Sequence, residues 1–81
     1  MTKDEIKERA RAALAKALKA DPQTIADTAS QADLSAWDSV RHMNVVIALE
    51  NEFGIEFTDA ELSGLTSLPF LVTAIERHMT A

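Results

Sequence analysis

The sequence contains no cysteine among its 81 residues, which excludes a disulfide framework, a cysteine-based metal site and a thiol nucleophile. It also lacks any apolar run near the ~20 residues that a membrane-spanning helix requires. The first fourteen residues mix acids with bases and show no apolar segment of the kind found in signal peptides. We therefore expect a cytoplasmic protein that neither crosses nor binds a membrane.

A chain of this length has material for one hydrophobic core, so we expect a single domain over residues 1–81. A core of this size is only marginally stable, and helices with local contacts are the most direct way to build one. The fold class expected from length and pattern is therefore all-α.

Acidic residues outnumber basic ones by thirteen to eight, and the formal net charge is −5. Seven of the eight bases lie between residues 3 and 41, whereas residues 50–61 hold five acids and no base. Such an acidic stretch repels nucleic acid and anionic membranes, and it attracts a basic partner. A solvated surface that keeps the protein in solution has the same composition, so charge alone leaves both interpretations open.

Local signals predict a first helix over about Thr2–Ala20. Thr2 and Glu5 have the spacing of a capping box, and apolar residues then recur at helical intervals. Asp21-Pro22 stops this helix, because a residue before proline is pushed out of the helical region. The long connection that follows, residues 21–37, needs side chains that anchor it. Its large apolar residues are Ile25, Leu34 and Trp37, and we expect these three to be the anchors.

A second helix is predicted over Ser39–Phe53, with Gly54 as a left-handed C-cap. Its apolar residues cover a wide arc, which indicates packing against more than one neighbour, or against neighbours and a ligand. These residues are Val40, Met43, Val46, Ile47, Leu49 and Phe53.

Two further helical segments complete the pattern. Thr58 and Glu61 form a second capping box that opens a short helix ending at Leu62, and Ser67 caps the last helix. The expected architecture is three main helices plus one short helix, with a long first loop. The residues expected to be mostly buried are Ile6, Leu14, Leu18, Val46, Ile47, Phe53, Leu71, Val72 and Ile75.

The segment Trp37-Asp38-Ser39-Val40 opens the second helix, and Leu49-Glu50-Asn51-Glu52-Phe53-Gly54-Ile55 closes it. A serine in the first turn of a helix points into solvent beside unpaired backbone N–H groups, which is a favourable place for a bound anion. On the residues alone, an ordinary helix cap shared between Asp38 and Ser39 is the favoured explanation of the pair.

These segments resemble the attachment motif of the acyl and peptidyl carrier family. In that family an Asp-Ser-Leu triplet opens the second helix, and a stretch of the form Leu-Glu-x-x-Phe-Gly-Ile closes it. The resemblance extends over most of the chain, since the helix lengths, the long first loop and the short third helix all agree. It implies an acyl-carrier-like bundle in which Ser39 accepts a 4'-phosphopantetheine arm from coenzyme A. It also implies that Asp38 caps the helix and helps the transferase engage the serine.

The resemblance further implies a monomeric carrier that catalyses nothing itself. Its cargo is an acyl or aminoacyl group held as a thioester, and tethering raises the concentration of that cargo at each partner enzyme. The implied partners are a phosphopantetheinyl transferase and the enzymes that load and transfer the cargo. The alternative is a helical interaction module that shares this fold and never carries a cofactor.

Three residues of the second helix depart from the family pattern. Val40 replaces the usual leucine, while Arg41 and Asn44 occupy positions where carriers of fatty acid synthesis have acids. In those carriers the acids meet basic patches on the synthase enzymes. The departures favour a specialised fatty-acid, polyketide or related biosynthetic pathway.

The two histidines raise two further hypotheses. His42 lies three residues after Ser39, within reach for a Ser-His nucleophile pair. Such a pair needs an orienting acid and an oxyanion site, and neither is visible, so we expect His42 to lie on the surface and predict no catalytic residue. His78 is expected on the surface at a helix end. The two residues lack metal-ligand spacing, and we predict no metal site.

Overall fold

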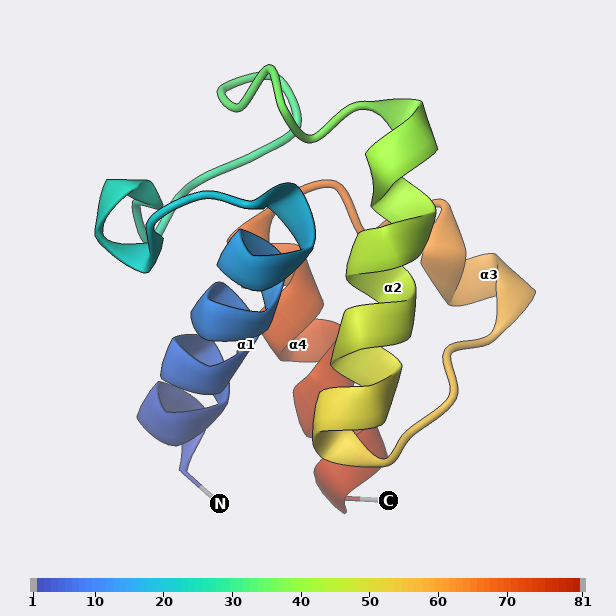
Figure 1. The fold of residues 1–81 in the computed structure, drawn as a ribbon. Helices are drawn as coiled ribbons and strands as arrows, with labels where there is room; N and C mark the ends of the chain where they lie inside the picture. Colours follow the sequence, from blue (N-terminus) through green and yellow to red (C-terminus); the bar gives the residue numbers. More distant parts are fainter. Residues whose placement is uncertain (1, 81) are drawn as a thin grey trace.

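The computed structural model describes residues 2–80 and shows, within them, four α-helices and one short 3-10 helix. The α-helices are α1 (Lys3–Leu18), α2 (Ser39–Phe53), α3 (Asp59–Leu62) and α4 (Leu68–Thr80), and the 3-10 helix is η1 (Pro22–Thr24). α1 and α2 run side by side in opposite directions, with α4 packed behind them (Figure 1). The expected all-α bundle of three main helices and one short helix is confirmed.

Local hydrogen bonds fix both ends of α1. The predicted capping box is present: the Thr2 hydroxyl accepts from the Glu5 N–H at 3.2 Å, and the Glu5 carboxylate accepts from the Thr2 N–H at 3.3 Å. At the other end Lys19 adopts the left-handed conformation, with φ of 56°, and its N–H turns back to the last carbonyls of the helix. α1 therefore ends at Leu18, two residues before the expected Ala20.

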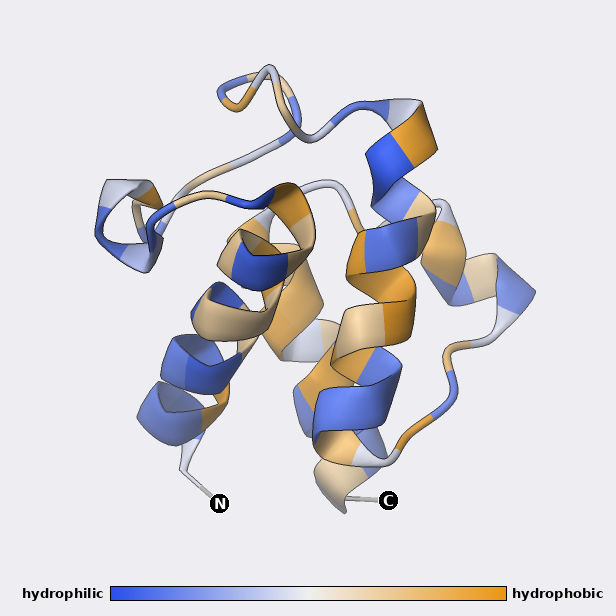
Figure 2. Ribbon diagram, in the orientation of Figure 1, coloured by the Kyte–Doolittle hydropathy of each residue, from blue (hydrophilic) through white to orange (hydrophobic). Residues whose placement is uncertain are grey.

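α2 buries a narrower face than its sequence indicates. Ile47, expected in the core, is 51% exposed, whereas Val45 is fully buried. The buried residues of α2 are Val45, Val46, Leu49 and Phe53. At 100° per residue these four positions form one stripe toward α1 and α4, and Ile47 falls on the opposite side. The outer half of the wide apolar arc lies outside the hydrophobic core formed within residues 2–80. Figure 2 shows apolar segments from the first turn of α2 to its last.

Two buried side chains hold the long connection between α1 and α2. Ile25 and Trp37 are 2% and 1% exposed, and Leu34 is partly buried against the same core, so all three predicted anchors are confirmed. Backbone hydrogen bonds also tie the connection to the segment before α4. The Gln31 N–H donates to the Thr66 carbonyl at 2.9 Å, and the Leu68 N–H donates to the Ala29 carbonyl at 2.8 Å.

A polar anchor of this connection was not predicted. The Arg11 guanidinium of α1 donates to the backbone carbonyl of Ile25 and to the carboxylate of Asp27. Lys7 adds a second ion pair to Asp27, at 3.3 Å. The hydrogen bond from Arg11 lowers the pKa of Asp27 below its usual value, with Lys7 as the second cause. The connection that leads to Ser39 is therefore held to α1 by charge as well as by apolar packing.

The predicted starts of the last two helices are also confirmed. Thr58 and Glu61 form the capping box of α3, and the Ser67 hydroxyl accepts from the Phe70 N–H at 3.3 Å in the first turn of α4. None of the helices in the described part of the chain is both long and apolar enough to cross a membrane.

Candidate functional site

Ser39 is the first residue of α2 and is exposed to solvent. It lies at the end of the bundle opposite the two chain termini (Figure 1). Asp38 is the N-cap: one carboxylate oxygen accepts from the Arg41 N–H at 2.8 Å, as expected for a helix cap. The second oxygen pairs with the Arg41 guanidinium at 3.1 Å.

The surroundings of Ser39 suit an anion attached to its hydroxyl. Asp38 satisfies the Arg41 N–H, while the N–H groups of Ser39 and Val40 have no acceptor among residues 2–80. Unpaired N–H groups at the positive end of a 15-residue helix favour negative charge. Arg41 balances the charge of Asp38, so this carboxylate does not present an unopposed negative charge to the anion. The residues present therefore fit a phosphodiester on the Ser39 oxygen.

Trp37 and His42 hold each other immediately behind this first turn. The Trp37 Nε1–H donates to His42 Nδ1 at 3.0 Å, and the rings stack with centroids 6.1 Å apart. Because an indole only donates, His42 Nδ1 must be unprotonated, and the neutral ring carries its proton on Nε2. His42 is half-buried and hydrogen-bonded to Trp37, which corrects the expectation of a plain surface residue. No hydrogen bond joins Ser39 to His42 in the described residues, and the geometry gives a Ser-His nucleophile pair no support.

His78 also has a partner that its sequence position did not reveal. Its Nε2 lies 2.9 and 3.1 Å from the two carboxylate oxygens of Glu61, and its ring meets Phe57 edge-on at 5.7 Å. The backbone N–H of Thr58 is the main cause of a lowered pKa at Glu61, and His78 is the second. His78 thus joins α4 to α3 rather than lying free at a helix end. No group of three or more His, Asp or Glu side chains able to hold a metal ion occurs within residues 2–80.

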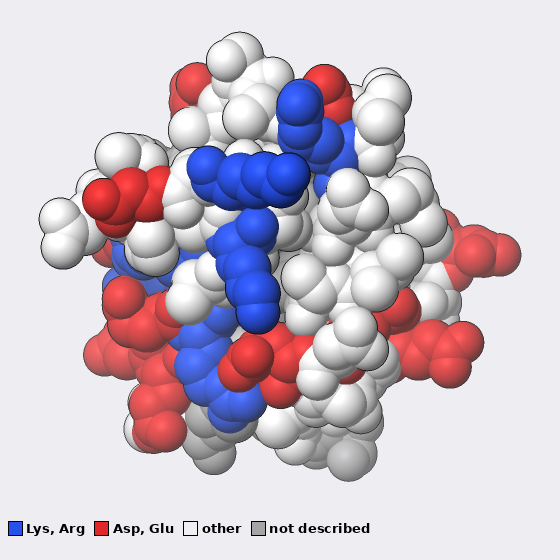
Figure 3. All heavy atoms as spheres, viewed as in Figure 1, with Lys and Arg blue, Asp and Glu red and all other residues white. Residues whose placement is uncertain are grey.

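The surface beside Ser39 combines exposed apolar residues with positive charge. Val40, Met43 and Ile47 of α2 are 80%, 51% and 51% exposed. In the view of Figure 3, basic side chains form a band over α1 and recur at the start of α2, while acidic side chains gather mainly in the lower half. The acids of residues 50–61 begin in the last turn of α2 and continue into α3, which lies beside α2 on the side away from α1 in Figure 1.

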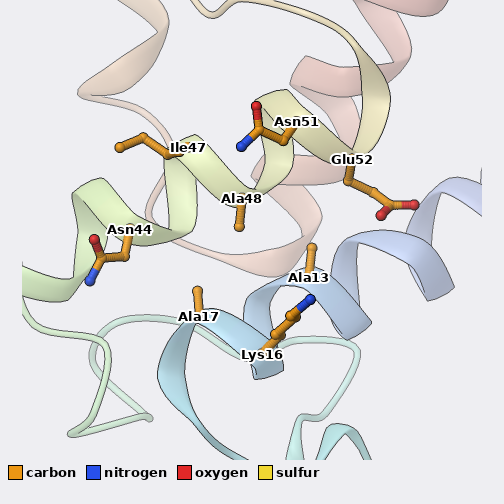
Figure 4. Close-up of a pocket in the computed structure, with 8 residues that line it drawn as sticks. All are labelled: Ala13, Lys16, Ala17, Asn44, Ile47, Ala48, Asn51 and Glu52. Carbon is orange, nitrogen blue, oxygen red and sulfur yellow. The ribbon is translucent and has the colours of Figure 1, made fainter.

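A shallow groove of about 540 Å³ runs between α1 and α2 on this side. Small alanine side chains on both helices form its floor, and longer polar side chains rise at its edges (Figure 4). Its lining residues are Ala13, Lys16 and Ala17 of α1 and Asn44, Ile47, Ala48, Asn51 and Glu52 of α2.

Comparison with known proteins agrees with this geometry. Residues 8–75 match the family model described as "Phosphopantetheine attachment site". An acyl carrier protein from Thermosynechococcus vestitus (strain NIES-2133 / IAM M-273 / BP-1) is 35% identical over 82 aligned positions, which cover 100% of both chains. With an exposed serine opening the second helix of a matching bundle, the chain belongs to the acyl carrier protein family, whose members are carriers with a 4'-phosphopantetheine cofactor rather than enzymes.

Proposed function

We propose that Ser39 is the residue to which the 4'-phosphopantetheine arm is attached. The observation that carries this assignment is an exposed hydroxyl on the first residue of α2, beside two backbone N–H groups without an acceptor among residues 2–80. Asp38 orients this turn by capping it, and we assign it a second role in recognition by the phosphopantetheinyl transferase. The whole chain, residues 1–81, then acts as one carrier domain.

The bound arm would supply a terminal thiol that holds acyl or aminoacyl cargo as a thioester, a form activated for transfer. The residues of the chain itself bind the phosphodiester of the arm and orient its point of attachment. The first turn of α2 stabilises the phosphodiester charge, and the Trp37–His42 pair fixes the backbone that enters this turn. The protein has no cysteine, so no thiol of its own competes for the cargo.

The supporting argument for a specialised pathway is the charge of α2. From Ser39 to Leu49 this helix has no acid, and Arg41 and Asn44 stand where carriers of bulk fatty acid synthesis have acids. The proposed function is therefore acyl or aminoacyl transport for a specialised fatty-acid, polyketide or related pathway. We further propose that the protein is a cytoplasmic monomer whose partners are the transferase and the loading and transferring enzymes, with no role in binding nucleic acid or membranes.

Intact-mass measurement tests the attachment residue. Incubation of the apo protein with coenzyme A, Mg²⁺ and a broad-specificity phosphopantetheinyl transferase should add one phosphopantetheine to the wild type and none to Ser39→Ala. Ser30→Ala and Ser35→Ala serve as controls and should be modified as fully as the wild type, because those hydroxyls lie in the preceding connection. Modification that persists in Ser39→Ala would overturn the assignment. An unmodified wild type would favour the alternative of an interaction module without a cofactor.

A further inference from the structure

The outward side of α2 carries an apolar stripe that no other part of residues 2–80 covers. Val40, Met43 and Ile47 follow one another at intervals of three and four residues and so lie on one side of the helix. Asn44 and Asn51 are exposed beside them. The stripe begins one residue after Ser39, which means that any enzyme reaching the Ser39 oxygen comes close to it.

Positive charge borders this stripe on the α1 side. Lys16 lines the groove together with Asn44 and Ile47, and Lys19 lies one turn further toward the Ser39 end of the bundle. Both lysines are exposed, and neither has an ion pair within residues 2–80. Figure 3 shows the resulting band of basic side chains, although the whole molecule has a formal net charge of −5.

Three acids of α2 and its N-cap have partners. Glu52, at the far end of the groove, pairs with Arg9 at 2.7 Å. Glu50 is half-buried, and its carboxylate accepts from the Phe57 N–H at 2.8 Å. Asp38 pairs with Arg41 at the other end. The stripe therefore has positive charge along one edge and no unpaired acid within it.

We propose that the enzymes acting at Ser39 dock on this surface through an apolar patch bordered by carboxylates. We call it the α1–α2 face and define it by Val40, Met43 and Ile47 with Lys16 and Lys19. Apolar area supplies most of the binding free energy, while charge complementarity raises the encounter rate and excludes wrong partners. The acidic residues 50–61, expected from sequence to attract a basic partner, begin in the last turn of α2 and continue into α3, on the other side of α2 from α1 in Figure 1. This inference rests on the proposed function of Ser39.

The test uses a general fatty-acid ketosynthase with a basic docking patch, and a variant of it in which those bases are replaced by glutamate. A phosphopantetheine analogue with an electrophilic end is loaded onto Ser39, so that docking is measured as the rate of covalent cross-linking to the ketosynthase cysteine. At low salt the wild-type carrier should cross-link about tenfold faster with the acidic variant than with the parent enzyme, because complementary charge raises association rates by at least this factor. The difference should shrink in ~0.5 M salt, where exposed charges are screened.

Two matched variants localise the effect. Lys16→Glu and Lys3→Glu change the net charge equally, but Lys3 lies at the start of α1, away from the face. Lys16→Glu should abolish the preference for the acidic ketosynthase, and Lys3→Glu should leave most of it. Ile47→Ala should slow cross-linking with both enzymes without lowering the melting temperature, since Ile47 contributes nothing to the core.

Faster cross-linking of the wild type to the basic parent enzyme would overturn the proposal, as would identical behaviour of the two lysine variants. Failure of the proposed function gives a different result, because intact mass would then show that Ser39 never accepts the analogue. That result would remove both proposals.

Discussion

Trp37 and His42 flank the attachment serine in sequence and meet behind it in space. Trp37 is 1% exposed, so its indole N–H is out of reach of water and needs an acceptor from the protein. His42 Nδ1 is that acceptor, at 3.0 Å. The pair joins the end of the long connection to the first turn of α2, and it thereby fixes the direction from which the backbone enters Ser39.

Replacement of His42 tests this hydrogen bond. His42→Phe keeps an aromatic ring but leaves the indole N–H buried without an acceptor, which should lower the free energy of unfolding by about 1–3 kcal/mol. His42→Gln retains an acceptor at the end of a flexible side chain and should lose less. Urea unfolding followed by circular dichroism measures both. A His42→Phe variant that is more stable than His42→Gln would show that the ring contact matters and the hydrogen bond does not.

At the scale of elements, α3 is the least self-sufficient helix of the bundle. It has four residues, fewer than an isolated helix needs to persist in water. Two interactions of Glu61 hold it: the capping box with Thr58, and the contact with His78 of α4. Both favour the ionised carboxylate, which is why the pKa of Glu61 lies below its usual value.

This lowered pKa predicts a pH dependence of stability. Because the folded state binds the Glu61 proton more weakly than the unfolded state, the stabilisation is present above the usual glutamate pKa of about 4.3 and is lost as pH falls through the lowered folded value. Glu61→Gln preserves the capping-box geometry but removes the titration. Its free energy of unfolding should therefore fall less between about pH 6 and pH 3 than that of the wild type.

Urea titrations at several pH values measure the two slopes. Glu56→Gln is the matched control, since Glu56 is an exposed acid of the same stretch with no hydrogen bond in the described residues. It should retain the wild-type slope. A Glu61→Gln slope equal to that of the wild type would assign the acid sensitivity to other carboxylates, of which Asp27 beside Arg11 is the first to test.

The same scale shows what the sequence could predict. Helix starts at Thr2, Asp38, Thr58 and Ser67 depend on side chains within three residues of the affected N–H, so local spacing predicts them. The prediction that Ile47 is buried is wrong because its exposure depends on which neighbours α2 has in the fold, and the spacing of apolar residues within α2 does not show them. The long-range partners of Arg11 and His78, namely Ile25, Asp27 and Glu61, lie fourteen or more residues away in sequence, and no local pattern indicates them. Local spacing predicts that Asp38 and Ser39 open α2, whereas their proposed roles in attachment rest on the family resemblance.

Across the whole molecule, more of the acidic side chains have partners than the composition indicates. Three of the five acids in residues 50–61 have partners: Glu50 accepts from the Phe57 N–H, Glu52 pairs with Arg9, and Glu61 meets Thr58 and His78. The sequence alone does not show that these three acids have partners. What remains unbalanced is the formal net charge of −5 spread over a molecule with a radius of gyration of 11.3 Å.

Added salt has opposite effects on two electrostatic contributions to stability, the net-charge repulsion and the exposed ion pairs. It screens net-charge repulsion and so stabilises the folded state, but it also weakens exposed pairs such as Arg9–Glu52, which are worth at most about 1 kcal/mol each. We expect repulsion to dominate, so that the melting temperature rises by about 2–6 °C between dilute buffer and ~0.2 M NaCl, on the usual relation between free energy and melting temperature for a domain of this size.

Glu56→Lys makes the net charge less negative by two, and Lys3→Glu makes it more negative by two. The first should flatten the response and the second should steepen it, because screening can relieve only the repulsion that each variant contains. A melting temperature that stays flat or falls with salt in the wild type would mean that the weakening of ion pairs outweighs the relief of net-charge repulsion.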